Sequence, residues 1–341
     1  MAVKKIDKSN MRKIILNFPG QFKVGVEAAK NIFLEKGSFL TPPENIIVCG
    51  MGGSGLPGDI LVTLRPLDMF VYKSYRLPPQ ASNKSLIVCV SYSGNTEETL
   101  SSFQTAINQN LPVISITTGG KLAELSKKHH APCVILPPPY VPPRLALGEM
   151  FAALVQVLAN HNLLGKGIIE EVLRVGDSLA PEKLEKQGKK IAEKIFGKIP
   201  IIYNSRRLRE IGWIWKNSLN ETAKILAITN YLPEVNHNEI VGFWKINEMQ
   251  IENEKLYVII LRDKTGSHPR ILKQMKITKE LIEKEGIKVG FVDMGGETLL
   301  EKIFSSIILG FWTAYWLALE YKIDPTPVKP IEELKRRLRE E

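Results

Sequence analysis

The sequence of 341 residues contains few cysteines, and none has the spacing of a metal site. Cys49, Cys89 and Cys133 lie in or beside apolar, strand-like runs and form no C-x-x-C pair. This pattern indicates buried thiols in a reducing compartment rather than disulfides or metal ligands. We therefore expect a cytoplasmic protein without a metal site.

A long uninterrupted apolar run is also lacking. The basic start at residues 1–5 is not followed by the apolar stretch of a signal peptide. The longest apolar segment, residues 303–319, is interrupted by two serines and a threonine and is followed by Glu320. This segment fits a buried helix better than a membrane span, so no membrane partner is expected.

Blocks of a single charge sign are absent as well. The formal net charge is +10, but the lysines are spread along the chain and interleaved with glutamate, as in residues 183–186. Such interleaving is typical of solvated helix faces, so we expect no nucleic-acid partner. The positive excess still favours acidic substrates.

What the sequence does contain is a glycine-rich loop at residues 50–58, between an apolar strand-like run and a segment with leucines at helical spacing. Glycines let a ligand approach the backbone, and amides at a helix start carry partial positive charge, which suits phosphate. Ser54 adds a hydroxyl. The spacing matches neither a dinucleotide site nor a Walker loop, so a tight turn without a ligand is the alternative.

A second loop follows the continuous apolar run at residues 85–90, which is typical of a parallel strand covered on both faces. Ser91, Ser93 and Thr96 bring three hydroxyls to the start of a helix that Ser93 or Asn95 can cap. Because ligands bind at the carboxyl ends of parallel strands, both loops could face one crevice. The alternative is a serine-rich loop that only caps a helix.

The order of strands and helices from residue 46 to 158 predicts a parallel sheet of five strands with helices on both sides. Arg144 follows a stiff, proline-rich connector and precedes an apolar helix at residues 145–158. A cation has no favourable dipole interaction at a helix start. Arg144 therefore indicates either an anionic partner or an ordinary surface arginine.

A second α/β unit is predicted after a charged helical crossing that Pro181 breaks. Its predicted strands cover residues 200–203, 227–228 or nearby, 256–261 and 289–292, and its helices cover residues 212–224, 269–284 and 299–320. The strand at 256–261 ends in Arg262 and Asp263 without a serine-rich loop. One architecture is thus used twice, and only the first unit is equipped for phosphate.

The two loops, residues 50–55 and 91–99, resemble those of the sugar isomerase (SIS) domain family. The segments Asn-Glu-Thr-Ala-Lys at 220–224, Pro-Glu-Val-Asn-His-Asn-Glu-Ile at 233–240 and the tail at 324–335 resemble the bifunctional phosphoglucose/phosphomannose isomerase family. The resemblance covers nearly the whole chain.

The resemblance implies an α/β fold of two SIS domains, each a mostly parallel five-stranded sheet flanked by helices in an α-β-α sandwich. The implied domain limits are 1–165, a helical connection at 166–198, 199–320, and a C-terminal segment at 321–341 that contributes to the active site. A homodimer with shared active sites is also implied.

The resemblance assigns roles to individual residues. Arg144 would stabilise an enediolate, Glu221 would be the base, His237 would act in ring opening from the partner chain, and Lys335 would assist there. The substrate phosphate would be held by Gly53, Ser54, Ser91, Ser93 and Thr96.

The predicted function is a cofactor-free aldose–ketose isomerase that interconverts glucose 6-phosphate and fructose 6-phosphate, and by the resemblance also mannose 6-phosphate. A family threonine that admits both epimers aligns with Val328, and Thr326 lies nearby. Partial burial would raise the pKa of Glu221 toward the working pH, and His237 can protonate a ring oxygen. The alternatives are an isomerase of another sugar phosphate and a non-catalytic sugar-phosphate sensor.

Overall fold

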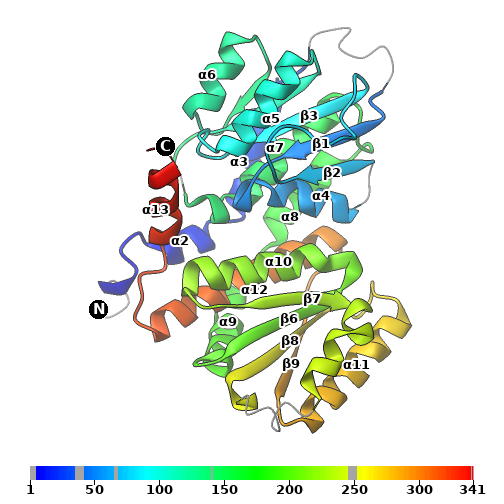
Figure 1. Cartoon of the computed structure of the whole chain (residues 1–341), viewed down its shortest axis with the longest axis vertical. Helices are drawn as coiled ribbons and strands as arrows, with labels where there is room; N and C mark the ends of the chain where they lie inside the picture. Colours follow the sequence, from blue (N-terminus) through cyan, green and yellow to red (C-terminus); the bar gives the residue numbers. More distant parts are fainter. Residues whose placement is uncertain are drawn as a thin grey trace. The chain divides into compact units, whose positions relative to one another are not determined.

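The computed structural model describes residues 5–34, 42–64, 68–139, 141–244, 252–338 and 340. The chain forms two compact units, one of Asn17–Leu179 and one that combines Met1–Leu16 with Ala180–Glu341 (Figure 1). The division at residue 179 falls inside the predicted helical connection. The predicted domain limits themselves stay a prediction.

The first unit contains a fully parallel sheet of five strands, as the sequence predicted. Its spatial order is β2-β1-β3-β4-β5. All six residues of β3 are buried, which explains the continuous apolar run. The strands are β1 (Asn45–Cys49), β2 (Met69–Tyr72), β3 (Ser85–Val90), β4 (Val113–Thr117) and β5 (Cys133–Ile135).

Helices cover both faces of this sheet (Figure 1). On one face, Phe103, Ala106 and Leu122 from α5 (Glu97–Asn108) and α6 (Gly120–Lys128) pack against β1 and β3. The helices α3 (Gly20–Ala29), α4 (Leu56–Leu64), α7 (Leu147–Asn160) and α8 (Ile168–Ser178) pack together on the other face. The crossovers bring the strand ends that carry the two loops to one edge.

The second unit contains a parallel sheet of order β7-β6-β8-β9, so the predicted fifth strand is wrong for the described residues. After β9 the chain enters the long helix α12 and then the tail helix α13 (Lys329–Leu338), which has no buried residue. A tail of this charge cannot form a buried strand. The strands are β6 (Ile199–Ser205), β7 (Ile228–Leu232), β8 (Leu256–Arg262) and β9 (Lys288–Asp293).

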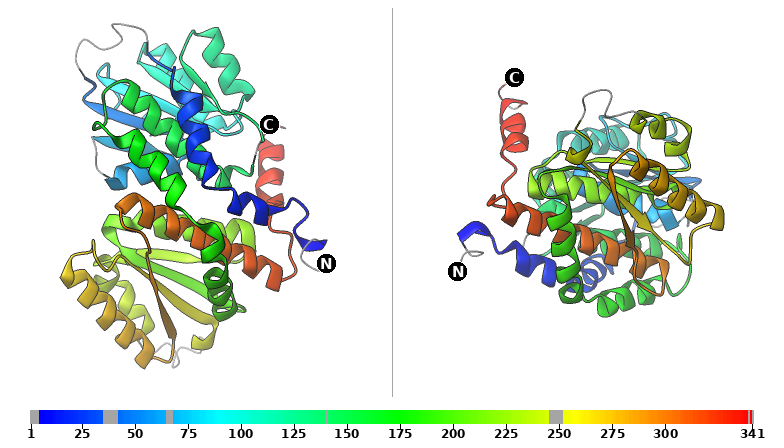
Figure 2. Two further views of the ribbon diagram at one scale, coloured as in Figure 1. Left: turned by 180° about the vertical axis from the view of Figure 1, so that it is seen from behind. Right: turned by 90° about the horizontal axis from the view of Figure 1, so that it is seen from below.

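The core of the second unit lies on both faces of its sheet. Helix α11 (Pro269–Lys284) packs on one face with the short turns η5 (Glu234–His237) and η6 (Glu239–Phe243). Helices α9 (Pro181–Ile195), α10 (Arg209–Ser218) and α12 (Leu299–Glu320) form the other layer, and α9 runs beside α12 (Figure 2). Pro181 is the first residue of α9, as expected of a break in the helical crossing.

Helix α12 is the one helix among the described residues that is long and apolar enough to cross a membrane. However, 83% of its most apolar 18-residue window is buried inside the fold. Thr298 and Glu301 form a capping box that starts the helix. The predicted buried helix at 299–320 is therefore confirmed.

Candidate active site

The glycine loop after β1 forms the short turn η1 (Gly52–Ser54) and leads directly into α4. Gly52 has a φ of 48°, and a side chain on Gly55 would lie 2.5 Å from the carbonyl oxygen of Gly50. Glycine is required here because the chain folds back on itself without room for a Cβ atom. The predicted strand, loop and helix are confirmed.

The serine loop after β3 lies against the glycine loop. The Tyr92 amide donates to the Ser54 hydroxyl oxygen at 3.0 Å, and the Ser91 hydroxyl donates to the Thr96 hydroxyl oxygen at 3.0 Å. Ser54 and Ser91 are buried, whereas Ser93 is exposed. The structure thus joins both predicted phosphate loops at the carboxyl edge of the first sheet.

The predicted helix cap is wrong, because neither Ser93 nor Asn95 caps α5. Thr96 precedes the first residue of α5 and makes no side-chain cap bond. Asn95 instead accepts a hydrogen bond at 3.1 Å from the Lys121 amide, in the first turn of α6. The serine loop lies so close to the loop before α6 that a Cβ atom on Gly94 would lie 1.8 Å from the Gly119 oxygen. This close approach places Asn95 beside the start of α6.

Arg144 lies in the turn η2 (Pro143–Leu145) and is only 7% exposed, so an ordinary surface arginine is excluded. The turn packs directly on the glycine loop. A side chain on Gly53 would lie 3.0 Å from the Arg144 amide nitrogen and 2.9 Å from the Pro143 oxygen. The structure therefore brings Arg144 to the same edge as the predicted phosphate loops.

Gln21 on α3 fixes the chain on the other side of Arg144. Its side-chain amide donates to the Leu145 carbonyl at 2.7 Å, and its oxygen accepts from the Gly148 amide at 2.9 Å. Gln21 is buried and thus satisfies amides at the start of α7. Sequence reasoning missed this contact because it spans more than 120 residues and has no local pattern.

Glu149 is a second buried polar residue that the sequence did not indicate. It lies in the first turn of α7 and is 5% exposed. Burial raises the pKa of the Glu149 carboxyl to about 7, and a hydrogen bond from the Tyr92 hydroxyl opposes this shift. The side chain of this acid therefore adjoins the serine loop.

Glu221 lies in η4 (Leu219–Ala223), a π-helical turn that continues α10, and is partly buried. Lys224 follows in the left-handed conformation with a φ of 59°. The Lys224 ammonium donates to the carbonyls of Glu221 at 2.5 Å, Thr222 at 3.2 Å and Pro325 at 3.0 Å. The turn that carries the predicted base is thereby fastened to the C-terminal segment.

His237 ends the turn η5 and is exposed. The residues on either side are fixed, because Asn236 accepts from the Thr278 hydroxyl at 2.8 Å and Asn238 caps η6. Within the described parts of the chain, the His237 ring has no hydrogen-bond partner. An ordered loop thus presents an accessible imidazole.

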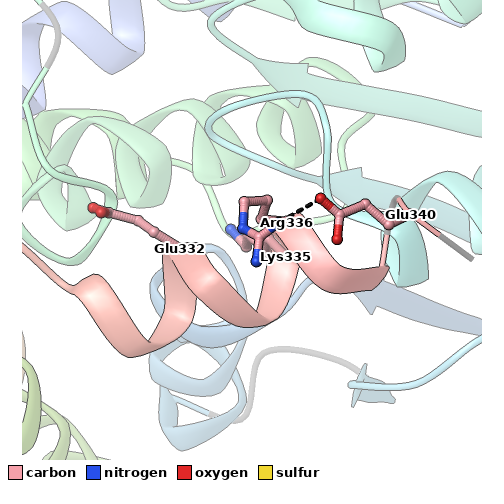
Figure 3. A pocket seen from close by; sticks show the side chains of 4 residues that line it. All are labelled: Glu332, Lys335, Arg336 and Glu340. Carbon is pink, nitrogen blue, oxygen red and sulfur yellow. Dashed lines mark hydrogen bonds and ion pairs between the residues drawn. The ribbon is translucent and has the colours of Figure 1, made fainter.

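Lys335 lies on α13 and is exposed. It lines a surface pocket of about 410 Å³ together with Glu332, Arg336 and Glu340 (Figure 3). Arg336 pairs with Glu333 and with Glu340. Lys335 therefore lies on a solvated helix in the single chain.

The predicted site residues are divided between the two units. Gly53, Ser54, Ser91, Ser93, Thr96 and Arg144 belong to the unit Asn17–Leu179. Glu221, His237 and Lys335 belong to the other unit. Among the described residues, no group of three or more His, Cys, Asp or Glu side chains is arranged as a metal-ligand set.

The corresponding edge of the second sheet holds an anion of its own. Asp263 follows β8 and is 3% exposed. Its carboxylate accepts from the Gly266 amide at 2.9 Å and from the Lys302 ammonium at 2.9 Å. The Gly266 amide and the Lys302 ammonium are therefore occupied by a side chain of the protein, and the prediction that only the first unit is equipped for phosphate stays a prediction.

Comparisons with known proteins identify the family. A bifunctional phosphoglucose/phosphomannose isomerase of Aquifex aeolicus is 35% identical over 308 residues, which is 88% of this chain and 92% of the relative. The chain belongs to the bifunctional phosphoglucose/phosphomannose isomerase family. A relative of the same name in Caldicellulosiruptor bescii is 34% identical over 345 residues, covering 97% of this chain and 99% of that one. The predicted family is confirmed.

Other comparisons agree on the SIS fold. A family model described as the bacterial phospho-glucose isomerase C-terminal SIS domain matches residues 184–338. A putative phosphosugar isomerase structure from Clostridium difficile has a TM-score of 0.67 at 17% identity, covering 93% of this chain and 95% of that one. A relative named D-glucosamine-6-phosphate 4-epimerase, from Sulfolobus acidocaldarius, is 34% identical over 223 residues, 65% of this chain and 70% of that one.

Proposed function

We propose that this member of the family interconverts glucose 6-phosphate, fructose 6-phosphate and mannose 6-phosphate as an aldose–ketose isomerase. The observation that carries the proposal is the meeting of the glycine loop, the serine loop and the buried Arg144 at one edge of a parallel sheet. Such an edge is where open α/β sheets bind ligands. The composition of these loops suits a phosphate monoester.

The phosphate is held by hydroxyl groups and backbone amides. The Ser54 hydroxyl accepts one internal hydrogen bond, and the Ser91 hydroxyl donates one. Because a hydroxyl group can both donate and accept, each can form a further hydrogen bond to a phosphate. Ser93 and Thr96 lie at the more open end of the loop. Together with the Gly53 backbone, these groups fix one end of the sugar phosphate.

The reaction needs one base and a stabilised intermediate. The Glu221 carboxylate takes the proton from the carbon beside the carbonyl, which leaves a cis-enediolate, and returns that proton to the former carbonyl carbon, while the hydroxyl proton of the first carbon passes to the former carbonyl oxygen. The Arg144 guanidinium stabilises the negative oxygen, because it stays charged and donates in a fixed direction. No electrons are exchanged with a second reactant, so the proposal includes no cofactor.

His237 of the partner subunit opens the cyclic sugar by protonating the ring oxygen, and Lys335 assists this step. The support for a shared site is the exposed imidazole on an otherwise fixed loop. A homodimer with two shared sites follows from the proposal. The proposal also includes the domain limits predicted from the sequence, in which residues 321–341 contribute to the site.

The test is a coupled assay of the purified chain in EDTA with fructose 6-phosphate and mannose 6-phosphate. Glu221→Gln should lower kcat by about 10²- to 10⁴-fold, because the base is lost. Glu280→Gln on the surface of α11 serves as the matched control and should leave kcat unchanged. Binding of sugar phosphate without turnover in the wild type would contradict the proposal.

The shared site has its own test. Dimers of Glu221→Gln chains alone and of His237→Ala chains alone should have little activity, but a mixed dimer should retain one intact site. Mixing equal amounts and allowing subunit exchange should therefore restore about a quarter of wild-type activity, because about half of the dimers are mixed and each has one intact site of two. No recovery despite demonstrated exchange would place His237 and Glu221 of one site on the same chain.

The relative named as an epimerase supports one alternative substrate class. Glucosamine 6-phosphate should therefore be offered in the same assay, with the products separated by chromatography. Turnover of this amino sugar in preference to fructose 6-phosphate would replace the proposed substrates with an amino-sugar phosphate.

A further inference from the structure

Tyr92 stands between the two serines of the serine loop and is 4% exposed. Its amide donates to the Ser54 hydroxyl oxygen at 3.0 Å, so its backbone connects the serine loop with the glycine loop. The residue has no role in the proposed proton transfer. Its contacts nevertheless reach several segments at this edge of the sheet.

The remaining polar groups of Tyr92 contact three further segments. Its carbonyl oxygen accepts from the Thr118 amide at 3.0 Å and from the Thr118 hydroxyl at 2.6 Å, in the loop after β4. Its hydroxyl accepts from the Val141 amide at 3.2 Å, and the same hydroxyl lowers the pKa of the neighbouring Glu149 carboxyl against the effect of burial. Val141 lies three residues before Arg144 in the proline-rich connector.

We infer that Tyr92 is a positioning residue for substrate phosphate binding, because it holds the serine loop, the glycine loop and the Arg144 connector in one arrangement. This inference rests on the proposed function. A phosphate clamp made of hydroxyls and amides works only when these donors converge within about 0.5 Å of the bound geometry. One buried side chain that bonds to several segments can provide that precision.

The hydroxyl, rather than the ring, carries the inference. A phenylalanine would fill nearly the same space but would leave the Val141 amide and the Glu149 carboxyl without this partner. Within the described residues, Oε1 of Glu149 is already buried without a hydrogen bond. Relaxation that repairs these losses would move the connector relative to the serine loop.

The test is Tyr92→Phe in the full-length chain. The KM for fructose 6-phosphate and the inhibition constant of inorganic phosphate should both rise about 3- to 10-fold, which is the range expected for one lost hydrogen-bond system. The kcat should stay within about twofold, because Glu221 is untouched. A matched control is Tyr315→Phe, which removes another buried hydroxyl that donates to a carboxylate, Asp7, at 3.1 Å. It should lower thermal stability but leave KM unchanged.

A second variant, Thr118→Val, removes the 2.6 Å bond that holds the Tyr92 backbone to the loop after β4, so it tests the placement of Tyr92 independently if Tyr92→Phe does not fold. It should also raise KM and the phosphate inhibition constant. If the wild type is active and the folded variants keep its KM and its phosphate inhibition constant, the inference about Tyr92 is overturned, but the proposed function is not. If the wild type binds phosphate without turnover, the proposed function fails, and calorimetric phosphate affinities of the same variants still decide the role of Tyr92.

Discussion

The buried Glu149 carboxyl links folding to pH. Its pKa in the folded chain is raised to about 7 by burial, so the folded state holds the proton more tightly than the unfolded chain does. The contribution to stability is fully present below the unfolded pKa of about 4.3 and is lost as the pH rises through about 7. Ionisation then places an uncompensated charge beside the serine loop.

Glu149→Gln should remove this pH dependence, because glutamine resembles the protonated acid and does not ionise. The unfolding free energy of the wild type, relative to the variant, should fall by up to about 3 kcal/mol between pH 4.5 and 8. Urea denaturation at several pH values measures the difference. Parallel curves for both proteins would mean that Glu149 does not titrate in this range.

The ion pair of Asp263 and Lys302 is a second buried charge system. Burial alone would raise the pKa of Asp263, but the hydrogen bond from Lys302 and the amides of Gly266 and Thr265 outweigh burial and lower it. The stabilisation is therefore present above the ordinary carboxyl pKa and is lost as the pH falls through the lowered value.

Asp263→Asn should destabilise the chain by about 3 kcal/mol at neutral pH, because it leaves the Lys302 ammonium buried without its anion. Replacing both residues, Asp263→Asn with Lys302→Met, should recover much of the loss. Chemical denaturation of the single and double variants measures the coupling. Additive losses would show that the pair is not the source of the stability.

The sequence motif located the two loops that meet at one edge of the sheet, but not the residues that orient them. The position of Ser54, Ser91 and Thr96 at one sheet edge could be predicted, because glycine and hydroxyl patterns directly after strands are recognisable in the sequence. Gln21 and Glu149 could not, since each acts through a contact with a distant segment.

Among the elements, the turn η4 connects the C-terminal segment to the predicted base. Lys224→Met should release the Pro325 carbonyl and loosen the Glu221 turn, so kcat should fall about tenfold with a small change in KM. Lys216→Met on the preceding helix is the matched control and should keep kcat. Stopped-flow or coupled assays separate the two constants. An equal fall in kcat in Lys224→Met and Lys216→Met would show that Lys224 has no special role.

Strands and long helices were predictable where burial imposes one pattern. The β3 run is apolar at nearly every position because helices cover both faces, and α12 carries its capping box in the sequence. The π-helical form of η4 was not predictable, because α10 and η4 share one helical pattern. The prediction of the α5 cap was wrong because Asn95 accepts a hydrogen bond from α6, a tertiary contact that the local sequence does not show.

At the scale of the whole molecule, the N-terminal residues pack into the unit that contains Ala180–Glu341. Arg12 forms two hydrogen bonds with Glu185, at 2.8 and 2.7 Å, and Asp7 accepts from Tyr315. Met11 is fully buried. The N-terminal segment therefore completes the core around α9 and α12, although the chain between them builds the other unit.

Removal of residues 1–16 should destabilise the unit Ala180–Glu341 by about 3 kcal/mol or more, chiefly through lost burial. Arg12→Gln alone should cost less than about 1 kcal/mol, because the Arg12 side chain is 47% exposed. Hydrogen exchange of α9 and α12 amides reports the loss locally. Unchanged protection in the shortened chain would contradict this dependence.

The Asp263 carboxylate also determines how many ligands one chain can take. The fold supplies two sheet edges of the same kind, but one of them carries a covalently attached anion whose local concentration no dissolved phosphate can match. Titration calorimetry with fructose 6-phosphate should therefore saturate at one molecule per chain, not two. One molecule per chain is the stoichiometry expected when the donors in one half of a duplicated architecture already bind the protein's own carboxylate.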